Sequence, residues 1–162
     1  MDDYTGEKRP CYFPEGNLAP NNVPCSGERY TSCCGYQDIC LSNGLCLATE
    51  VQPYVISRGA CTNQNWDSGC PEYCREDTPD RGSSIINYSF DISKPESRYC
   101  CGLIGANNGT TNCGNGRERI TIATGYPLPG VGLLANTTLL SQMQDDQTSN
   151  SNDTCLTQPT AD

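Results

Sequence analysis

The chain has 162 residues, among them 13 cysteines and no histidine, and its formal net charge at pH 7 is −9. Hydrophobic residues make up only 35% of the sequence, so we expect disulfides or metal ions to support a small core. The negative charge argues against nucleic acid or an anionic membrane surface as a partner, because both require a positive patch on the protein.

In chain order, the sequence divides into four parts. Residues 1–10 are polar and predict a flexible N-terminus, whereas residues 11–46 hold six cysteines and predict a small cysteine module. Residues 47–125 hold six more cysteines and predict a second disulfide-bonded β module, and residues 126–162 predict a polar, low-complexity tail or stalk. The predicted fold class is therefore small and disulfide-rich, with short β-strands, long loops and little helix.

Regular elements are few in this sequence. The clearest strand is predicted over residues 84–93, where apolar and polar residues alternate. Its apolar face is expected to contain Ile86, Tyr88, Phe90 and Ile92. A second strand is predicted over residues 117–124, with Ile120 and Ile122 on one side, and we expect the two strands to pair. Residues 70–74 predict one short helical turn, because proline suits the start of a helix.

Metal binding and redox chemistry fit the cysteine spacing poorly. Structural zinc sites typically use CxxC pairs or mixed cysteine and histidine ligands, and a thioredoxin-like site also requires CxxC. The chain contains neither, and the adjacent Cys33 and Cys34 are poorly shaped to hold one tetrahedral ion together. We therefore predict a framework of about six disulfides, without a bound metal or a cofactor.

The pairing of the second cysteine group stays open, because six cysteines permit fifteen arrangements. This group consists of Cys61, Cys70, Cys74, Cys100, Cys101 and Cys113. The thirteenth cysteine, Cys155, lies in the predicted tail. We expect it to pair with a cysteine assigned elsewhere, to stay free, or to link two chains as a disulfide-bonded dimer.

Residues 11–46 show the cysteine spacing C-x13-C-x7-CC-x5-C-x5-C. This spacing resembles hevein-type chitin-binding modules and inhibitor-knot toxins, which share the adjacent cysteine pair. Both families pair the first cysteine with the fourth, the second with the fifth and the third with the sixth. For this chain, the resemblance implies the disulfides Cys11–Cys34, Cys25–Cys40 and Cys33–Cys46.

A wider resemblance covers roughly residues 11–113. The blocks CYFPEGNLAPNNVPC, CCGYQDICLSNGLC and RGACTNQNWDSGCPEYC are similar to a group of uncharacterised cysteine-rich proteins of filamentous ascomycete fungi. Those proteins are secreted, or they carry a Ser/Thr-rich stalk and a membrane anchor after the cysteine region. The resemblance implies a fungal origin and an extracellular compartment, but the group has no established activity to transfer.

Candidate ligand contacts are few. In hevein-type modules, a serine follows the cysteine pair and aromatic residues form the sugar platform, whereas the matching positions here are Gly35, Gln37, Ile39 and Leu45. The remaining candidates are Tyr36, Tyr30 and the single tryptophan, Trp66. The alternative for Tyr36 is packing over the disulfides, and the alternative for Trp66 is a core position within its cysteine loop.

Catalysis is not expected. Without histidine, the chain has no Ser-His-Asp or Cys-His arrangement and lacks the commonest general base. The two lysines, Lys8 and Lys94, lie in polar contexts, and the acidic residues between 72 and 80 are expected to form a solvated loop. We therefore predict no catalytic residues.

Four N-x-S/T sequons support an oxidising, extracellular compartment, as the cysteines do. Their asparagines are Asn87, Asn108, Asn136 and Asn152. No signal peptide is visible, which we expect for a mature or recombinant form with Met1 added. The best apolar stretch, residues 131–140, is too short to span a membrane.

Together, these features predict a non-enzymatic fungal protein, secreted or at the cell surface, that acts through interactions. Its loops are expected to contact an unknown protein or a cell-wall glycan, as in an effector-like protein or a cell-surface glycoprotein. One alternative is a module that binds chitin or another wall carbohydrate. Further alternatives are a knottin-like protease inhibitor or toxin, and a purely structural wall glycoprotein.

Overall fold

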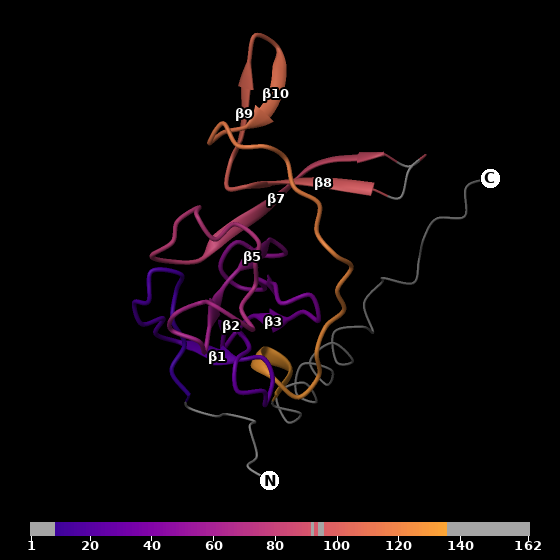
Figure 1. Cartoon of the computed structure of the whole chain (residues 1–162). Helices are drawn as coiled ribbons and strands as arrows, with labels where there is room; N and C mark the ends of the chain where they lie inside the picture. Colours follow the sequence, from indigo (N-terminus) through magenta and orange to yellow (C-terminus); the bar gives the residue numbers. More distant parts are fainter. Residues whose placement is uncertain (1–8, 92, 94–95, 136–162) are drawn as a thin grey trace, which may run out of the picture.

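The computed structural model describes residues 9–91, 93 and 96–135. Within these residues, ten short strands and one 3-10 helix are joined by long loops (Figure 1). The elements are β1 (Asn22–Pro24), β2 (Ser32–Gly35), β3 (Ile39–Cys40), β4 (Cys46–Leu47), β5 (Ile56–Arg58), β6 (Ala60–Cys61), β7 (Ser83–Asp91), β8 (Glu96–Cys101), β9 (Ile104–Asn107), β10 (Thr110–Cys113) and η1 (Gly132–Ala135). The predicted class, a disulfide-rich fold of short strands with little helix, is confirmed.

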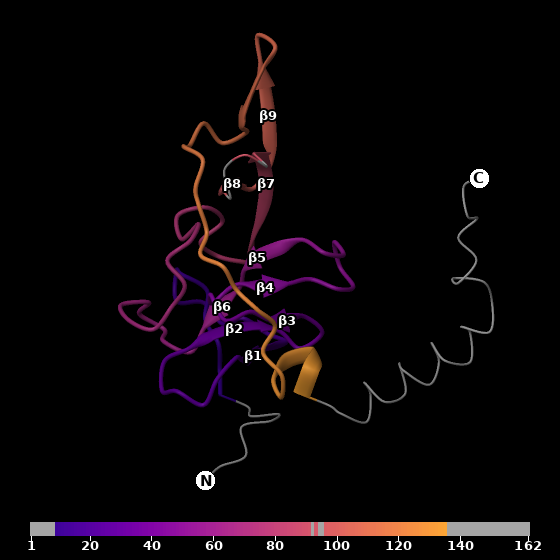
Figure 2. The same cartoon turned by 90° about the vertical axis from the view of Figure 1, so that its right-hand side faces the viewer.

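The strands form three antiparallel sheets. One has the order β1-β2-β6, the largest has the order β3-β4-β5-β7-β8, and β9 and β10 form a separate hairpin. Figure 2 shows β1, β2 and β3 at one end of the molecule, β5 and β7 in the middle, and β9 at the other end. The β9–β10 hairpin therefore projects from the body of the protein, as Figure 1 also shows.

Both larger sheets cross the predicted boundary after residue 46. Cys46 in β4 lies opposite Ser57 in β5, and Cys33 in β2 lies opposite Ala60 in β6. The two predicted cysteine modules are thus joined by backbone pairing in two places. The division of the chain into two cysteine modules stays a prediction.

Strand β7 covers most of the predicted strand over 84–93, but its buried face is not the predicted one. Ile85 lies opposite Ile56 on β5 and is only 2% exposed, whereas Phe90 is 67% exposed. The end of β7 that carries Phe90 extends beyond β5 and is accompanied only by β8, so no layer covers it. A register irregularity between Asn87 and Ser89 also interrupts the simple alternation of faces.

Two other predicted elements are absent from the described residues. Residues 117–124 form only an isolated bridge, in which Ile120 and Tyr99 exchange two backbone hydrogen bonds of 2.8 Å. Strand β7 pairs instead with β8, the next segment along the chain, and Ile120 and Ile122 pack against the core as single residues. Residues 70–74 form no helix, and of these residues only Tyr73 and Cys74 lie in a turn.

The beginning of the predicted tail is packed rather than extended into solvent. Leu128 and Val131 contact the cluster formed by the disulfides of β2, β3 and β4. The Leu128 N–H donates to the Cys40 carbonyl at 2.8 Å. The tail prediction is therefore corrected for residues 126–135. These residues include apolar side chains that pack against the core, whereas the polar composition on which the prediction rests begins at Asn136. Residues 136–162 lie outside the described part of the chain.

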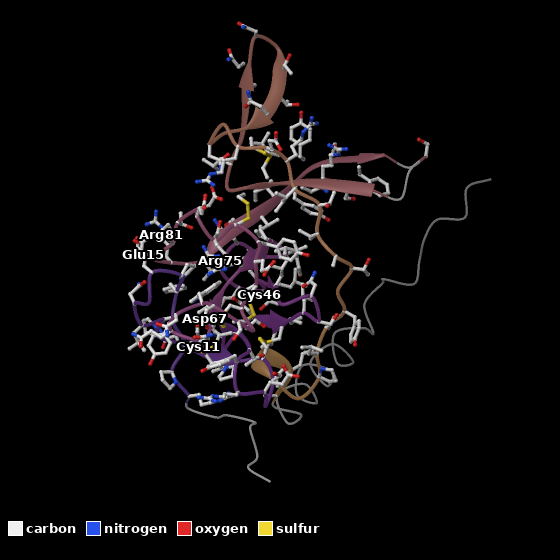
Figure 3. The ribbon with its side chains drawn as sticks, in the orientation of Figure 1. Cys11, Glu15, Cys46, Asp67, Arg75 and Arg81 are labelled. Atoms are coloured by element: carbon white, nitrogen blue, oxygen red, sulfur yellow. A yellow bond between two sulfur atoms is a disulfide. The ribbon has the colours of Figure 1, made fainter. Side chains whose placement is uncertain are left out.

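Six disulfides bond all twelve cysteines of the described residues and extend from the β1–β4 end to the base of the β9–β10 hairpin (Figure 3). The pairs are Cys11–Cys33, Cys25–Cys40, Cys34–Cys46, Cys61–Cys70, Cys74–Cys101 and Cys100–Cys113. Cys25–Cys40 agrees with the resemblance to knotted modules. Cys11–Cys34 and Cys33–Cys46 do not occur, because Cys33 and Cys34 exchange partners.

The directions of the two side chains on β2 explain this correction. Adjacent side chains of a strand point to opposite faces, so Cys33 and Cys34 reach different clusters. Cys33 packs with Cys11 and Ala60, and the chain around Cys11 is held there because Tyr12 exchanges backbone hydrogen bonds of 2.7 and 2.9 Å with Cys61. Cys34 packs on the other face with the cysteines of β3 and β4.

Arg58 is completely buried and organises the loop from residue 74 to residue 82. Its guanidinium donates hydrogen bonds of 2.8–3.3 Å to the carbonyls of Gly59, Cys74, Asp77, Thr78 and Arg81. Burial lowers the pKa of Arg58 to about 10, so the side chain remains charged at neutral pH. The five carbonyls satisfy the buried guanidinium, and no carboxylate is hydrogen-bonded to it. The same hydrogen bonds fix the loop, which has no regular structure.

Candidate functional site

Two adjoining hollows along β5 and β7 form the principal groove of the described residues. One has a volume of about 720 Å³ and the other about 470 Å³. Both are lined by Gln52, Val55, Gly82, Ser83 and Ser84. Because of these shared walls, we treat them as the apolar section and the polar section of a single groove.

The apolar section lies where β8 turns into β9. Leu103 is 80% exposed and Ile104 is 40% exposed, and Ile86 of β7 contributes a third aliphatic side chain. Gly102, with φ +83°, turns the chain here, and its N–H donates to the Ser84 carbonyl at 2.7 Å. The backbone is thus fixed while two aliphatic side chains face solvent, which is typical of an interaction surface.

The polar section lies between the N-terminal loops and β5. Tyr36 is 55% exposed and shares the walls with Gln37, Asp38 and the side-chain amides of Asn21 and Asn22. Burial raises the pKa of Asp38, and a hydrogen bond with the Thr49 backbone partly opposes that shift. This section offers one aromatic face together with hydrogen-bond donors and acceptors.

Gln52 marks the junction of the two sections. Its backbone adopts φ +54°, and its side-chain oxygen accepts a 3.0 Å hydrogen bond from the Ser84 hydroxyl. The same loop carries Val51 and Tyr54, which are 77% and 80% exposed. The β4–β5 loop is therefore tied to β7 while it presents large apolar side chains beside the groove.

Of the three predicted ligand contacts, only Tyr36 lies in this groove. Tyr30 lies in a separate hollow, half-buried, with its ring 5.1 Å from the Arg29 guanidinium carbon. Trp66 is only 1% exposed and donates its ring N–H to the Tyr12 carbonyl at 3.0 Å. The expectation of ligand contact is therefore corrected for Trp66, which fills the core of its cysteine loop.

The described sequons lie on the projecting strands. Asn87 of β7 and Asn108 of the β9–β10 turn are both exposed, so their positions are compatible with attached glycans. Their glycosylation stays a prediction. Asn136, Asn152 and the odd cysteine, Cys155, lie outside the described residues.

Two clusters contain side chains that bind metals in other proteins. One consists of Cys25, Cys34 and Cys40, and the other of Cys74, Asp77 and Cys101. Metal binding by cysteine requires the thiolate, and all five of these cysteines form disulfides. The clusters therefore represent close packing of disulfides rather than ligand sets.

The acidic loop predicted to be solvated is partly engaged. Arg117 forms ion pairs of 2.9 Å with Glu76 and 3.2 Å with Asp77, and Asn115 donates to the Asp77 carboxylate at 2.6 Å. Asp77 also lies at one wall of the apolar section. The Asp77 carboxylate is therefore engaged by Asn115 and Arg117, and these contacts hold residues 115–117 against the body of the protein.

Comparison of the chain with known protein families, with curated proteins and with solved structures finds no match. In the part of the chain that the structure describes, no helix has the length and apolar character needed to cross a bilayer. The fold and groove thus define a small, disulfide-rich β protein with an open groove on its surface.

Most residues of the groove are not recognisable from the sequence alone. They come from segments between residues 21 and 115, and their proximity depends on the pairing of β5 with β7. One local signal is present in the block CGLIG, residues 101–105, where two aliphatic residues stand between glycines directly after a disulfide. Glycines on both sides offer no side chains that could cover Leu103 and Ile104, so this block is a local indication that they are exposed.

Proposed function

We propose that the protein is a non-enzymatic, extracellular binding protein whose groove accepts an extended segment of a partner protein. The observation that carries this proposal is the exposure of Leu103 and Ile104, 80% and 40%, beside a hollow of about 720 Å³. A disulfide-bonded backbone presents these aliphatic side chains, so binding does not require the site itself to become ordered.

The division of the groove supports an extended ligand. The apolar section would take one or more aliphatic or aromatic side chains, and the polar section would bind main-chain or polar groups through Tyr36, Gln37 and the nearby amides. This combination of an apolar anchor with a polar rim is typical of protein recognition sites. Six disulfides and the lack of histidine favour an extracellular role without catalysis.

The biological setting rests on the resemblance to secreted fungal proteins. In that setting, the partner would be a host protein or a protein of the cell surface. The proposed role is therefore that of an effector-like protein or a cell-surface glycoprotein.

Peptide selection on the folded, full-length chain tests the binding proposal. We expect a displayed library of random linear peptides to yield sequences with a recurring apolar residue, and we expect Leu103→Ser to abolish their binding. Leu18→Ser is the matched control, since Leu18 is also exposed, at 59%, but does not line the groove. Failure to enrich any peptide, or equal binding by Leu103→Ser, would contradict the proposal.

A second candidate function, binding of a wall carbohydrate, is favoured by Tyr36 alone. An exposed aromatic ring among amide and carboxylate groups can stack against a sugar ring and bind its hydroxyls. A neutral glycan array with chitin and glucan oligomers separates the two candidates. Binding that is lost in Tyr36→Ala and retained in Leu103→Ser would support the carbohydrate function instead.

A further inference from the structure

A second concave site lies between β8, β10 and residues 117–119. Its volume is about 430 Å³, and Arg98, Arg117 and Arg119 all line it. The whole chain has only ten lysines and arginines and a net charge of −9, so three arginines in one hollow are a strong local concentration of positive charge. Glu118 also lines the hollow, which leaves the lining with a formal charge of +2 from three arginines and one glutamate.

Two of these arginines are available to a ligand. Arg117 is already engaged by Glu76 and Asp77 at 2.9 and 3.2 Å. Among the residues that the structure describes, Arg98 and Arg119 form no ion pair. A guanidinium has five N–H donors in a planar fork, which fits the oxygens of a carboxylate, sulfate or phosphate.

Arg119 is also oriented in advance. Its guanidinium carbon lies 4.7 Å from the centre of the Tyr88 ring, a cation–π contact that holds the side chain beside β7. The Tyr88 hydroxyl lies 2.7 Å from the Thr111 carbonyl, to which it donates, and 2.9 Å from the Thr111 hydroxyl. Tyr88 therefore connects β7, β10 and Arg119, and the Cys100–Cys113 disulfide closes the base of the hairpin.

Neutral polar side chains complete the hollow. Thr111 and Asn112 line it beside the arginines, and both can bind hydroxyl groups. The arrangement joins charged donors for an oxyanion with neutral groups for sugar hydroxyls. We propose that this arginine hollow binds an acidic polysaccharide through its carboxylate or sulfate groups, separately from the principal groove.

Binding of the intact protein to two defined polyanions tests this proposal. We expect retention at low salt on immobilised polygalacturonate, which supplies carboxylates, or on dextran sulfate, which supplies sulfates, and none on neutral dextran. Arg98→Gln with Arg119→Gln should weaken binding about tenfold or more, because each charge-assisted hydrogen bond contributes strongly. The control Arg29→Gln with Arg81→Gln makes the same change in net charge at two exposed arginines outside the hollow.

The outcomes separate this proposal from its competitors. Equal weakening by both double variants would mean that only overall charge matters and would overturn the site. Absence of wild-type retention on both polyanions would overturn it as well. If polyglutamate displaced the protein from the column as effectively as free polysaccharide does, the hollow would be assigned to an acidic protein instead. Arg98→Gln alone leaves the Arg119–Tyr88 contact in place, so weaker binding by this variant with unchanged thermal unfolding would support the proposal even if the double variant misfolds.

Discussion

Two buried or half-buried charged residues show how individual side chains determine this structure. Arg58 holds five carbonyls of its surroundings, and Asp38 lines the polar section of the groove with a raised pKa. Arg58 ends strand β5, but most of its acceptors lie in the irregular loop between residues 74 and 81, and Asp38 lies in the turn between β2 and β3. Their side chains therefore supply order that a sheet or helix supplies elsewhere.

Substitution of Arg58 should be strongly destabilising. Arg58→Met keeps an apolar stem but leaves the five carbonyls without their donor, and we expect a loss of about 3 kcal/mol or more in the free energy of unfolding. Arg29→Met, at an exposed arginine, should change stability by less than about 0.5 kcal/mol. Denaturant unfolding with disulfides intact measures both, and similar values for the two variants would contradict the role assigned to Arg58.

Asp38 should make stability depend on pH. Burial raises its pKa in the folded state, so the folded protein binds the proton more tightly than the unfolded chain does. The wild type therefore loses stability as pH rises from the ordinary aspartate pKa, 3.8, through the raised value. Asp38→Asn avoids this loss, and its stability relative to wild type should increase as pH rises from 3.8 through the raised pKa.

Denaturant unfolding at several pH values measures this difference for Asp38→Asn. The same series for Asp80→Asn, which removes an exposed carboxylate, gives the baseline for a lost surface charge. A stability difference for Asp38→Asn that is constant with pH, or that falls as pH rises, would show that the carboxyl is not desolvated.

At the scale of elements, the β9–β10 hairpin depends on its turn. Asn107 lies opposite Thr110, so Asn108 and Gly109 form a two-residue connection, with φ values of +52° and +75°. Positive φ at both positions is the pattern of the type I′ turn, which the Asn-Gly pair favours. The sequence thus contains a local signal for a hairpin, although the body of the protein does not enclose it.

Gly109→Ala should loosen this hairpin without disturbing the rest of the fold. A Cβ atom there would meet no neighbour within 4 Å, so the cost comes from the positive φ alone, about 1 kcal/mol. Hydrogen exchange should become faster for the amides of β9 and β10 and stay unchanged for β2 and β5. Gly82→Ala is the control, because its backbone lies outside the positive-φ region and the nearest atom to its Cβ is 3.5 Å away.

At the scale of the whole molecule, the disulfides replace a large apolar core. The three core clusters are small, and cysteines are members of each of them. The disulfides close loops with sequence separations from 9 to 27 residues. Closing a loop of such a length adds about 3 kcal/mol to the free energy of unfolding, because it restricts the unfolded chain. The adjacent Cys33 and Cys34 belong to two different clusters. The choice of their disulfide partners therefore decides how the N-terminal region packs.

Paired substitutions distinguish the observed disulfides, Cys11–Cys33 and Cys34–Cys46, from the knotted pairing that the resemblance implies. Cys11→Ala with Cys33→Ala removes one complete disulfide, so we expect no additional free thiols relative to wild type. Cys11→Ala with Cys34→Ala breaks two disulfides and leaves Cys33 and Cys46 without their partners, and we expect two additional thiols and a lower yield. Thiol titration under denaturing, non-reducing conditions measures this, and the opposite pattern would support the knotted pairing.

Local patterns predicted much of the framework. Cysteine content indicated a disulfide fold, alternation located β7, and glycine-rich segments indicated long loops. The partners of Cys33 and Cys34 were beyond these patterns, because they depend on which distant strand lies on each face of β2. The buried state of Trp66 likewise depends on Tyr12, which is 54 residues away.

Composition and cysteine number are enough to predict a chain held by disulfides, with little helix and without histidine for acid–base catalysis. The surfaces that are available to a ligand follow instead from the packing of distant segments. Packing placed Tyr36 and Leu103 in the two sections of one groove, buried Trp66, and gathered Arg98 and Arg119 into a hollow on an acidic protein. The physical reason is that strand pairing and disulfides bring distant segments together, and no local pattern encodes those distances.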